Sequence, residues 1–426
     1  MDVATQSNTS PATQDGMAPA AENSLGWTDK RSFPRRLRSV LALEDFEAAA
    51  RDYLPRPIFA YISGGSESGA TLRNNRAVFD EIAFVPQPIA DTTRRTLATT
   101  LFGQTYAMPF GFCPMGGTSL AGYQGDLVLA RVAAAANIPM IMSEAALTPL
   151  EQVRAAGPTT WYQTYPPGNA EVIAKIIERV ERAGFDTMVV TVDVPVPANR
   201  ENNVRNGFNL PLRPTPALAW ECLLHPRWFC GSFLRTLLVH GMPYYENMGP
   251  RVALISKSGV RGYGRRDQLT WEHLELMRRL WKGRLILKGI LDPGSARRAR
   301  ESGMDGVIVS NHGGRQLDGS IASLRALPAI VEQAKDMVVM LDSGIRRGTD
   351  VLKALALGVK FVFVGRPMIC AAAIGGETAV HHAVNLLRDE VDRNIALLGI
   401  SSPAEMSPRL LSPAHGTEFL TEALRR

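Results

Sequence analysis

The feature that most constrains the fold is a series of eight short apolar, β-branched or aromatic runs that extends over most of the chain. The runs lie at residues 109–113, 138–142, 159–163, 187–192, 284–288, 306–310, 337–342 and 360–365. Ala- or Leu-rich segments with helical spacing separate most of them, as at 126–137, 170–183 and 348–357. Repeated strand–helix units favour a parallel sheet wrapped by helices. Eight units favour a closed α/β (β/α)8 TIM barrel over an open doubly wound sheet.

The gap between the fourth and fifth runs, roughly residues 194–283, is far longer than an ordinary loop between a strand and its helix. It predicts a long insertion after strand four, which we place at 198–280 within a barrel that extends over 41–426. Ahead of the barrel, residues 1–29 are rich in Ser, Thr, Ala, Gln and Asn and lack Lys and Arg, and a basic cluster follows them. We expect 1–40 to form a disordered, basic N-terminal extension.

The insertion also differs from the rest of the chain in composition. Between residues 210 and 267, eight Lys or Arg stand against three Asp or Glu, and the first half carries Trp220, Trp228, Phe229 and Phe233. A segment that is aromatic, leucine-rich and basic suits contact with an anionic membrane surface, which we assign to 210–250. An active-site lid or an oligomer contact fits the same residues, so these interpretations stay open.

The bulk properties of the chain exclude several classes of protein. A net charge of +6 over 426 residues is mild, so we expect no nucleic-acid partner. The four cysteines form no CxxC pair and no metal-ligand spacing with the seven histidines, which indicates reduced thiols, no metal and a cytoplasmic location. No apolar run is long enough to cross a bilayer, and the N-terminus lacks a secretory signal. Any membrane contact would then be peripheral, on the inner face of the cytoplasmic membrane.

The segment Ser310–Gly319, which follows the sixth run, carries His312 and Arg315 on a backbone loosened by two glycines. A histidine supplies a base with a pKa near neutrality, and an arginine supplies a forked cation for a carboxylate. A histidine satisfied in the core beside a surface arginine would explain this segment taken alone. However, ionisable residues also follow nearly all of the remaining runs. The carboxyl ends of the strands are where such barrels carry their chemistry. We therefore predict an active site at these strand ends.

These strand-end residues fall into two chemical sets. The first follows the seventh and eighth runs, where barrels often bind phosphate, and comprises Asp342, Gly344, Arg346, Gly365 and Arg366. The second offers a base, an acid to orient it, a phenol, two arginines and a lysine, and comprises His312, Asp193, Tyr165, Arg200, Arg315 and Lys288. The fingerprints GxGxxG and GxxxxGK[ST] are absent, so the sequence does not support a Rossmann or Walker nucleotide site.

Several ordered motifs resemble the family of FMN-dependent 2-hydroxy-acid dehydrogenases and oxidases. They are Trp-Tyr-Gln-Thr-Tyr at 161–165, Leu-Lys-Gly at 287–289, Ser-Asn-His-Gly-Gly-Arg-Gln-Leu-Asp at 310–318 and Asp-Ser-Gly-Ile-Arg-Arg-Gly-Thr-Asp at 342–350. The resemblance extends from about Leu43 to Leu411. It is greatest to the membrane-associated (S)-mandelate dehydrogenase branch, through 222–228, 240–243 and 346–358; L-lactate dehydrogenases and glycolate oxidases are other members. It implies a TIM barrel, FMN as cofactor and a homotetramer.

The resemblance also implies a role for each residue of the site. His312 would be the base, Asp193 would hydrogen-bond to it, and Lys288 would lie beside the flavin N1/O2 edge, where negative charge develops. Tyr165 would contact the substrate hydroxyl. The substrate carboxylate would be held by Tyr61, Arg200 and Arg315. The remaining FMN contacts would come from Pro114, Gly116, Ser143, Gln163, Thr191, Asp342, Gly344, Arg346, Gly365 and Arg366.

Two positions depart from the glycolate oxidases of this family. Ala145 stands where those enzymes carry a tryptophan over the substrate, and Gly116 stands where oxidases typically carry alanine. Both favour a dehydrogenase whose substrate has an alkyl or aryl side chain. We predict oxidation of an (S)-2-hydroxy acid to the 2-oxo acid, with electrons passed to a quinone or another non-oxygen acceptor. The alternatives are the same chemistry with oxygen as the acceptor, and a non-catalytic flavin-binding barrel.

Overall fold

In a computed structural model of the chain, residue 34 and the ranges 37–209, 212–213, 215–249, 251–255 and 265–414 are described. The predicted N-terminal extension, 1–40, lies almost entirely outside these residues, and so do Lys257 and Arg261 of the insertion.

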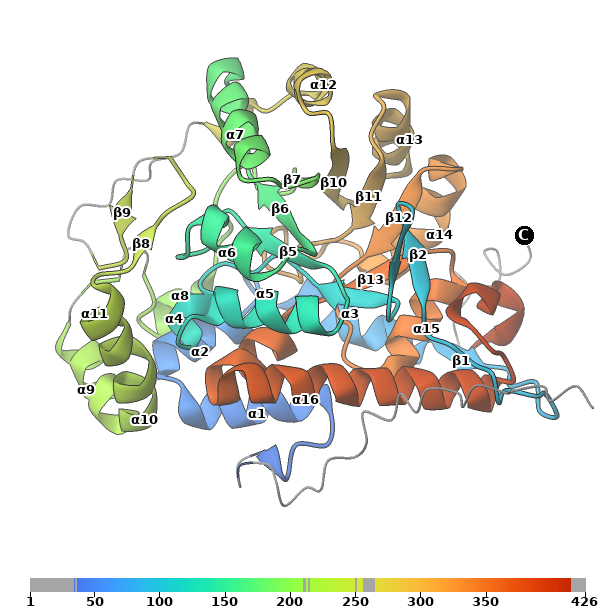
Figure 1. Cartoon of the computed structure of the whole chain (residues 1–426), viewed down its shortest axis with the longest axis horizontal. Helices are drawn as coiled ribbons and strands as arrows, with labels where there is room; N and C mark the ends of the chain where they lie inside the picture. Colours follow the sequence, from blue (N-terminus) through green and yellow to red (C-terminus); the bar gives the residue numbers. More distant parts are fainter. Residues whose placement is uncertain are drawn as a thin grey trace, which may run out of the picture.

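Eight parallel strands close into a barrel, in which each strand is hydrogen-bonded to its neighbours along the chain and the last pairs with the first. The strands are β4 (Phe110–Phe112), β5 (Met140–Ser143), β6 (Thr160–Thr164), β7 (Thr187–Thr191), β10 (Arg284–Ile290), β11 (Gly306–Val309), β12 (Val338–Leu341) and β13 (Phe361–Val364). Each strand overlaps one of the eight apolar runs, and the predicted (β/α)8 barrel is confirmed (Figure 1).

Helices surround the barrel and cover its outer face (Figure 1). The helix α7 shows why these segments are helical: Asn169 caps it by accepting the Val172 N–H at 3.0 Å, and its buried residues recur at the spacing of one helical face, Ile173, Ile177 and Val180. The helices between strands are α4 (Thr118–Ala121), α5 (Gly125–Ala135), α6 (Leu150–Ala156), α7 (Ala170–Arg182), α12 (Trp271–Leu280), α13 (Pro293–Glu301), α14 (Ser323–Ala334) and α15 (Gly348–Ala356).

Elements from the N-terminal part of the described chain pack against elements from its C-terminal part. The strand β1 (Ile82–Phe84) pairs antiparallel with β14 (Leu411–Pro413), and α1 (Leu43–Tyr53) packs along the long final helix α16 (Arg366–Leu398), as Figure 1 shows. The remaining elements here are α2 (Arg56–Ser63), α3 (Ala70–Asp80), and the short 3-10 turns η5 (Pro403–Glu405) and η6 (Pro408–Leu410). Although α2 and α3 precede the first barrel strand, the C-terminal end of α2 contacts residues that follow β11 and β13.

The interior of the barrel is filled by apolar side chains that alternate with outward-facing ones. In β10, Ile286 belongs to the interior cluster, whereas Leu285 and Leu287 belong to the core outside the barrel. The interior cluster takes residues from seven strands: Ile141, Trp161, Val189, Ile286, Ile308, Met340, Phe361 and Phe363. Leu101 and Tyr106, from the hairpin of β2 (Thr99–Leu101) and β3 (Gln104–Tyr106), complete the cluster and close the amino end of the barrel.

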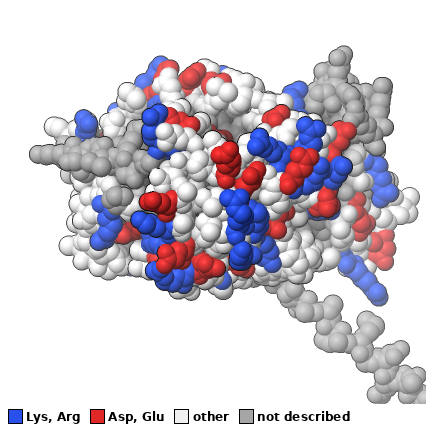
Figure 2. Space-filling view, turned by 90° about the horizontal axis from the view of Figure 1, so that it is seen from above, with Lys and Arg blue, Asp and Glu red and all other residues white. Residues whose placement is uncertain are grey.

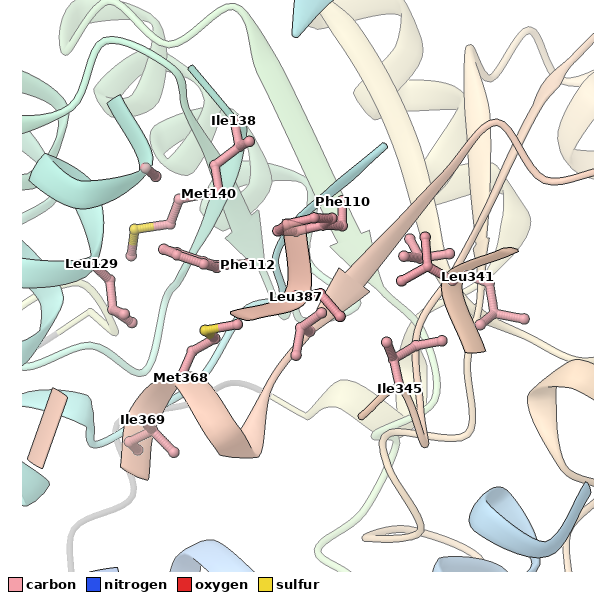
Figure 3. Close-up of a cluster of buried hydrophobic side chains, with 14 of the residues drawn as sticks. Phe110, Phe112, Leu129, Ile138, Met140, Leu341, Ile345, Met368, Ile369 and Leu387 are labelled. Carbon is pink, nitrogen blue, oxygen red and sulfur yellow. The ribbon is translucent and has the colours of Figure 1, made fainter. Parts of the chain in front are cut away.

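The core outside the barrel is the larger of the two, and α16 supplies much of it. Phe110 and Phe112 of β4 lie together with Met140 of β5 and with Met368 and Leu387 of α16 (Figure 3). All five side chains are at most 4% exposed. Burying such side chains is the main contribution to the stability of a domain of this kind.

The insertion between β7 and β10 folds into helical turns and a small hairpin at one side of the barrel, visible at the left of Figure 1. Its elements are α8 (Glu201–Arg205), α9 (Pro216–Leu224), α10 (Pro226–Trp228), the π-helical η3 (Phe229–Leu234), α11 (Arg235–His240), β8 (Tyr244–Tyr245), β9 (Val252–Ala253) and the 3-10 turn η4 (Arg266–Gln268). Trp228 fixes it to the barrel, because its indole N–H donates to the carbonyls of Leu120 and Ala121 at 3.2 and 3.1 Å.

The surface carries interspersed charge. Basic and acidic side chains lie next to each other over the face shown in Figure 2, and pairs such as Arg179–Glu151 and Arg95–Asp392 form ion pairs of 2.8 and 2.7 Å. Exposed pairs of this kind contribute little to stability. Among the helices in the described ranges, none combines the length and the apolar character needed to span a lipid bilayer.

We expect Leu387→Ala to lower the free energy of unfolding by about 2–5 kcal/mol, because it leaves a cavity between α16 and the barrel. Leu397→Ala on the same helix is the matched control: its side chain is 65% exposed, and the change should stay within about 0.5 kcal/mol. Chemical denaturation followed by circular dichroism measures both. Equal effects of the two substitutions would contradict the assignment of Leu387 to the core.

Candidate active site

A cavity of about 770 Å³ lies at the carboxyl ends of the barrel strands. Most of the predicted site residues line it: Tyr61, Pro114, Gly116, Tyr165, Arg200, Lys288, His312, Arg315, Asp342, Gly344, Arg346, Gly365 and Arg366. The other four, Asp193, Ser143, Gln163 and Thr191, adjoin the cavity without lining it. The fold therefore brings together residues that are up to 305 positions apart, from Tyr61 to Arg366.

The polar layer beneath this cavity follows from the alternation of the strands. In seven strands, a polar residue or glycine stands two positions after a residue of the apolar interior, and so faces the same side. This second layer consists of Ser143, Gln163, Thr191, Lys288, Ser310, Asp342 and Gly365. Its members contact one another across neighbouring strands, as when the Ser143 hydroxyl donates to the Gln163 side-chain oxygen at 3.1 Å.

Lys288 is the buried cation of this polar layer. Its ammonium lies 2.9 Å from the Asp342 carboxylate and donates to the Ser310 hydroxyl at 2.8 Å, and the Lys288 and Asp342 side chains are only 4% and 5% exposed. Burial lowers the pKa of Lys288, but Asp342 and Asp193 more than offset that effect and raise it above the usual range. Lys288 is therefore charged at neutral pH, with its ammonium group fixed at the base of the cavity.

His312 is held as a neutral base. Its Nδ1 lies 2.9 Å from Asp193 Oδ1, which leaves Nε2 as the nitrogen for chemistry, and its backbone N–H donates to the Ser310 hydroxyl at 3.0 Å. Burial lowers the pKa of His312 more than Asp193 raises it, so the imidazole is neutral at pH 7. Burial raises the pKa of Asp193, but the opposite effects of His312 and Lys288 are together larger. The pKa of this carboxyl is therefore below its usual value, and the carboxyl stays ionised.

Two arginines converge on the C-terminal end of α2. Arg315 and Arg366 each donate to the carbonyls of Ile62 and Gly64, at distances between 2.8 and 3.3 Å. Burial, with Arg200 and Arg366 nearby, lowers the pKa of Arg315 to about 9. Burial, with Arg346 nearby, lowers the pKa of Arg366 to about 10. Mutual repulsion among these guanidinium groups makes the cavity a favourable place for anions.

The other predicted side chains are held individually. Arg200 donates to the Arg315 carbonyl and the Gln316 side chain at 3.3 and 3.2 Å. Arg346 pairs with Glu47 at 2.5 Å. The Tyr61 hydroxyl donates to the Gly116 carbonyl at 3.2 Å. Burial raises the pKa of Tyr165 to about 12, so that its hydroxyl remains a donor.

The buried polar atoms of the second layer fit a planar, polar cofactor such as a flavin. In the part of the chain that the structure describes, Gln163 Nε2 and Thr191 Oγ1 are buried without a hydrogen-bond partner, which is costly unless a bound group satisfies them. Gln163 stands beside Ser143 in the β5–β6 register, and Thr191 stands opposite Lys288 in the β7–β10 register. These side chains would hold the ring edge, with Lys288 beside its most electronegative atoms.

Sequence reasoning missed several residues of this site. The insertion contributes an apolar wall, which consists of Phe208, Tyr245, Met248, Val252 and Leu254. Glu144 is 2% exposed directly after Ser143, and burial raises the pKa of its carboxyl to about 7. Its position next to a strand end is a signal that could have identified it. Composition alone could not reveal which apolar residues of the insertion turn towards the cavity.

Comparisons with known proteins agree with this geometry. A model of the family described as FMN-dependent dehydrogenase matches residues 50–413. An L-lactate dehydrogenase of Xanthomonas campestris pv. campestris (strain B100) is 36% identical over 377 residues, which cover 88% of this chain and 97% of that protein. An L-lactate dehydrogenase of Alcaligenes faecalis is also 36% identical, over 86% of this chain and 97% of that protein.

Solved structures give the same result. A crystal structure of (S)-mandelate dehydrogenase, described as a monotopic membrane protein, matches with a TM-score of 0.82 at 32% identity and covers 88% of this chain and 100% of that one. A mandelate oxidase bound to 3,3-difluoro-2-hydroxy-3-phenylpropionic acid matches with a TM-score of 0.73, also at 32% identity, over 88% and 100%.

We expect Asp193→Asn to lower the pKa of His312 further, because the carboxylate charge that favours the imidazolium is lost while its shape is kept. Titration of histidine-labelled protein by NMR measures this, with the His312 signal assigned by its loss in His312→Gln. Asp267→Asn, in the wall of the same cavity, is the control and should leave the titration unchanged. A rise in the pKa of His312 would contradict the prediction.

Proposed function

The chain belongs to the FMN-dependent dehydrogenase family, and we propose that it oxidises an (S)-2-hydroxy acid of the lactate or mandelate type to the 2-oxo acid. The observation that carries this proposal is the neutral His312, oriented by Asp193, in a cavity that Arg200 and Arg315 also line. A base and a forked cation are what deprotonation of an anionic hydroxy acid requires. FMN, when bound, supplies the acceptor for the two electrons that leave the substrate.

In the proposed mechanism, the protein binds the 2-hydroxy-acid anion, orients it and accepts a proton from it. Arg315, Arg200 and Tyr61 hold the substrate carboxylate. Tyr165 donates its hydroxyl hydrogen bond to the substrate hydroxyl. His312 accepts through Nε2 the proton that the substrate loses from its α-carbon or from its hydroxyl, and Asp193 stabilises the imidazolium that forms. Lys288 provides a fixed charge that needs no rearrangement as negative charge develops near it.

The walls of the cavity favour a substrate with a large side chain. A Cβ atom at Gly116 would lie 2.9 Å from the Cβ of Ala145 and 3.4 Å from the Tyr61 hydroxyl, so glycine here keeps space beside Ala145 open. The insertion adds Met248, Val252 and Leu254 to the same cavity. Small residues on one side and apolar ones on the other support an alkyl or aryl substituent on the hydroxy acid.

We propose a quinone or another non-oxygen electron acceptor. The curated relatives named above are L-lactate dehydrogenases, and a structural relative is the membrane protein (S)-mandelate dehydrogenase. Oxygen as acceptor is a second candidate, because a mandelate oxidase matches over the same share of the chain.

The assembly of this chain into a homotetramer, which the resemblance to the family implies, stays a prediction.

His312→Gln should lower the rate constant for flavin reduction by about 10²–10⁴-fold, because the proton acceptor is lost. Stopped-flow absorbance of the holoenzyme mixed anaerobically with (S)-lactate and (S)-mandelate measures this constant. His381→Gln, at an exposed position of α16, is the control and should react as the parent protein does. Unchanged reduction in His312→Gln, with full FMN content, would exclude His312 as the base.

The same instrument distinguishes the two acceptors. The reduced holoenzyme is mixed with air-saturated buffer or with a soluble quinone analogue, and the return of oxidised flavin is followed. We expect the quinone analogue to react faster than air. Reoxidation by air at the rate of turnover would assign the protein to the oxidases instead.

We propose that the insertion has two parts, a lid over the cavity and a peripheral contact with an anionic membrane through 210–250. The second part rests on the α9–α11 patch, in which Trp220, Leu223, Leu224, Leu238 and Val239 each expose more than half of their surface. Exposed basic side chains, Arg227 and Arg235, adjoin it in sequence. Contiguous exposed apolar residues commonly mark a protein or membrane interaction site.

The double variant Leu224→Ser and Leu238→Ser should reduce the fraction of holoenzyme that floats with phosphatidylglycerol-containing vesicles by at least about tenfold, because each buried leucine contributes about 1.5–3 kcal/mol. Leu397→Ser removes an equally exposed leucine from α16 and should float as the parent protein does. Equal flotation of all three proteins would exclude the α9–α11 patch as the membrane contact.

A further inference from the structure

We propose that Glu144 and Arg266 are positioning residues that together hold Tyr165 in place over the substrate. Glu144 holds the backbone of Tyr165, and Arg266 holds the Tyr165 ring. The inference rests on the proposed function in one respect, the role of Tyr165 as the donor to the substrate hydroxyl. Glu144 and Arg266 come from different parts of the chain, one directly after β5 of the barrel and one from the end of the insertion.

Glu144 fixes the point at which the chain leaves β6. Its carboxylate oxygen Oε2 accepts the Tyr165 backbone N–H at 2.6 Å and the Thr164 hydroxyl at 3.3 Å. Its own backbone N–H donates to the Gln163 carbonyl at 2.9 Å. Glu144 thus continues the pairing of β5 and β6 beyond the last residue of β5. A hydrogen bond to an ionised acceptor is shorter and stronger than one to a neutral acceptor.

Arg266 holds the aromatic ring of the same residue. Its guanidinium carbon lies 4.6 Å from the centroid of the Tyr165 ring, within the range of a cation–π contact. It is the first residue of η4, and it lines the cavity together with Tyr165. Arg266 is half-buried, so this contact is less screened by water than one at the surface.

The backbone around η4 is docked against the loop that carries Tyr165. The Gly168 N–H donates to the Arg265 carbonyl at 3.2 Å, and a Cβ atom at Gly168 would lie only 2.3 Å from the Gln268 carbonyl oxygen. Glycine at 168 therefore permits an approach that a side chain would prevent. This close packing holds the end of the insertion against the loop that follows β6.

The two positioning residues also interact with each other through their charges. Burial raises the pKa of Glu144 to about 7, and the Tyr165 N–H and Arg266 act in the opposite direction. Arg266 therefore favours the ionised form of Glu144, which holds the Tyr165 backbone more strongly.

The decisive experiment is a double-mutant cycle between Arg266 and Tyr165 in the holoenzyme. We expect Arg266→Ala to lower kcat about tenfold with the substrate that the parent protein oxidises faster, (S)-lactate or (S)-mandelate, and to change KM less than threefold. In the Tyr165→Phe background, which lacks the hydroxyl, Arg266→Ala should change kcat less than twofold. Arg265→Ala removes the neighbouring charge, which pairs with Asp267, and should change kcat less than twofold in either background.

Glu144 is tested by a conservative and a disruptive substitution. Glu144→Gln keeps an oxygen that can accept the Tyr165 N–H, and its kcat should stay within about threefold of the parent protein. Glu144→Ala should lower kcat at least tenfold at unchanged FMN content. Equal kcat in Glu144→Ala and the parent protein would overturn the proposal, and so would an equal effect of Arg266→Ala in both backgrounds.

Two outcomes separate this inference from the proposed function. If Glu144→Ala does not fold with FMN, the Arg266 and Tyr165 cycle still decides, because neither substitution empties the core. If the parent protein oxidises no 2-hydroxy acid, the proposed function fails. If it does so and Tyr165→Phe is fully active, the role of Tyr165 fails, and the positioning proposal is overturned with it.

Discussion

The closed barrel imposes one constraint on which the rest of the structure depends: side chains along each strand alternate between its inside and its outside. One layer of inward positions is filled by apolar residues such as Ile286, and the next layer towards the carboxyl ends must then also be buried. Charged groups at that depth are tolerated only when they are paired. The Lys288–Asp342 ion pair meets this requirement, and it keeps the Lys288 ammonium charged at the base of the cavity.

Burial then shifts the pKa values of three ionisable groups above that layer, His312, Tyr165 and Arg315. It keeps His312 neutral, keeps the Tyr165 hydroxyl protonated and brings arginines together at a cost that a bound anion offsets. Arg315 and Arg366 are held in place because they donate hydrogen bonds to the carbonyls at the end of α2. One physical cause, removal from water, therefore prepares a base, a donor and an anion site together.

The sequence predicted the barrel well because its strands are buried on both faces and appear as continuous apolar runs. It also located the strand ends, and with them most of the cavity lining. It could not predict which distant segments meet: periodicity identifies a face but not its partner, so the contacts of Glu144 and Arg266 were missed. Composition misled in one case, since Trp228 is a buried anchor to α4, whereas Trp220 is exposed.

The insertion starts after β7 and returns at β10, and these two strands are hydrogen-bonded neighbours. The register of this parallel pair, in which Thr191 at the end of β7 stands beside Lys288, therefore fixes where the insertion begins and where it ends, whatever lies between them. Lengthening a loop with fixed ends costs little entropy, so the segment can grow, shrink or be exchanged while the register of the barrel is retained. Evolution can accordingly change what this segment contacts without altering the residues at the strand ends.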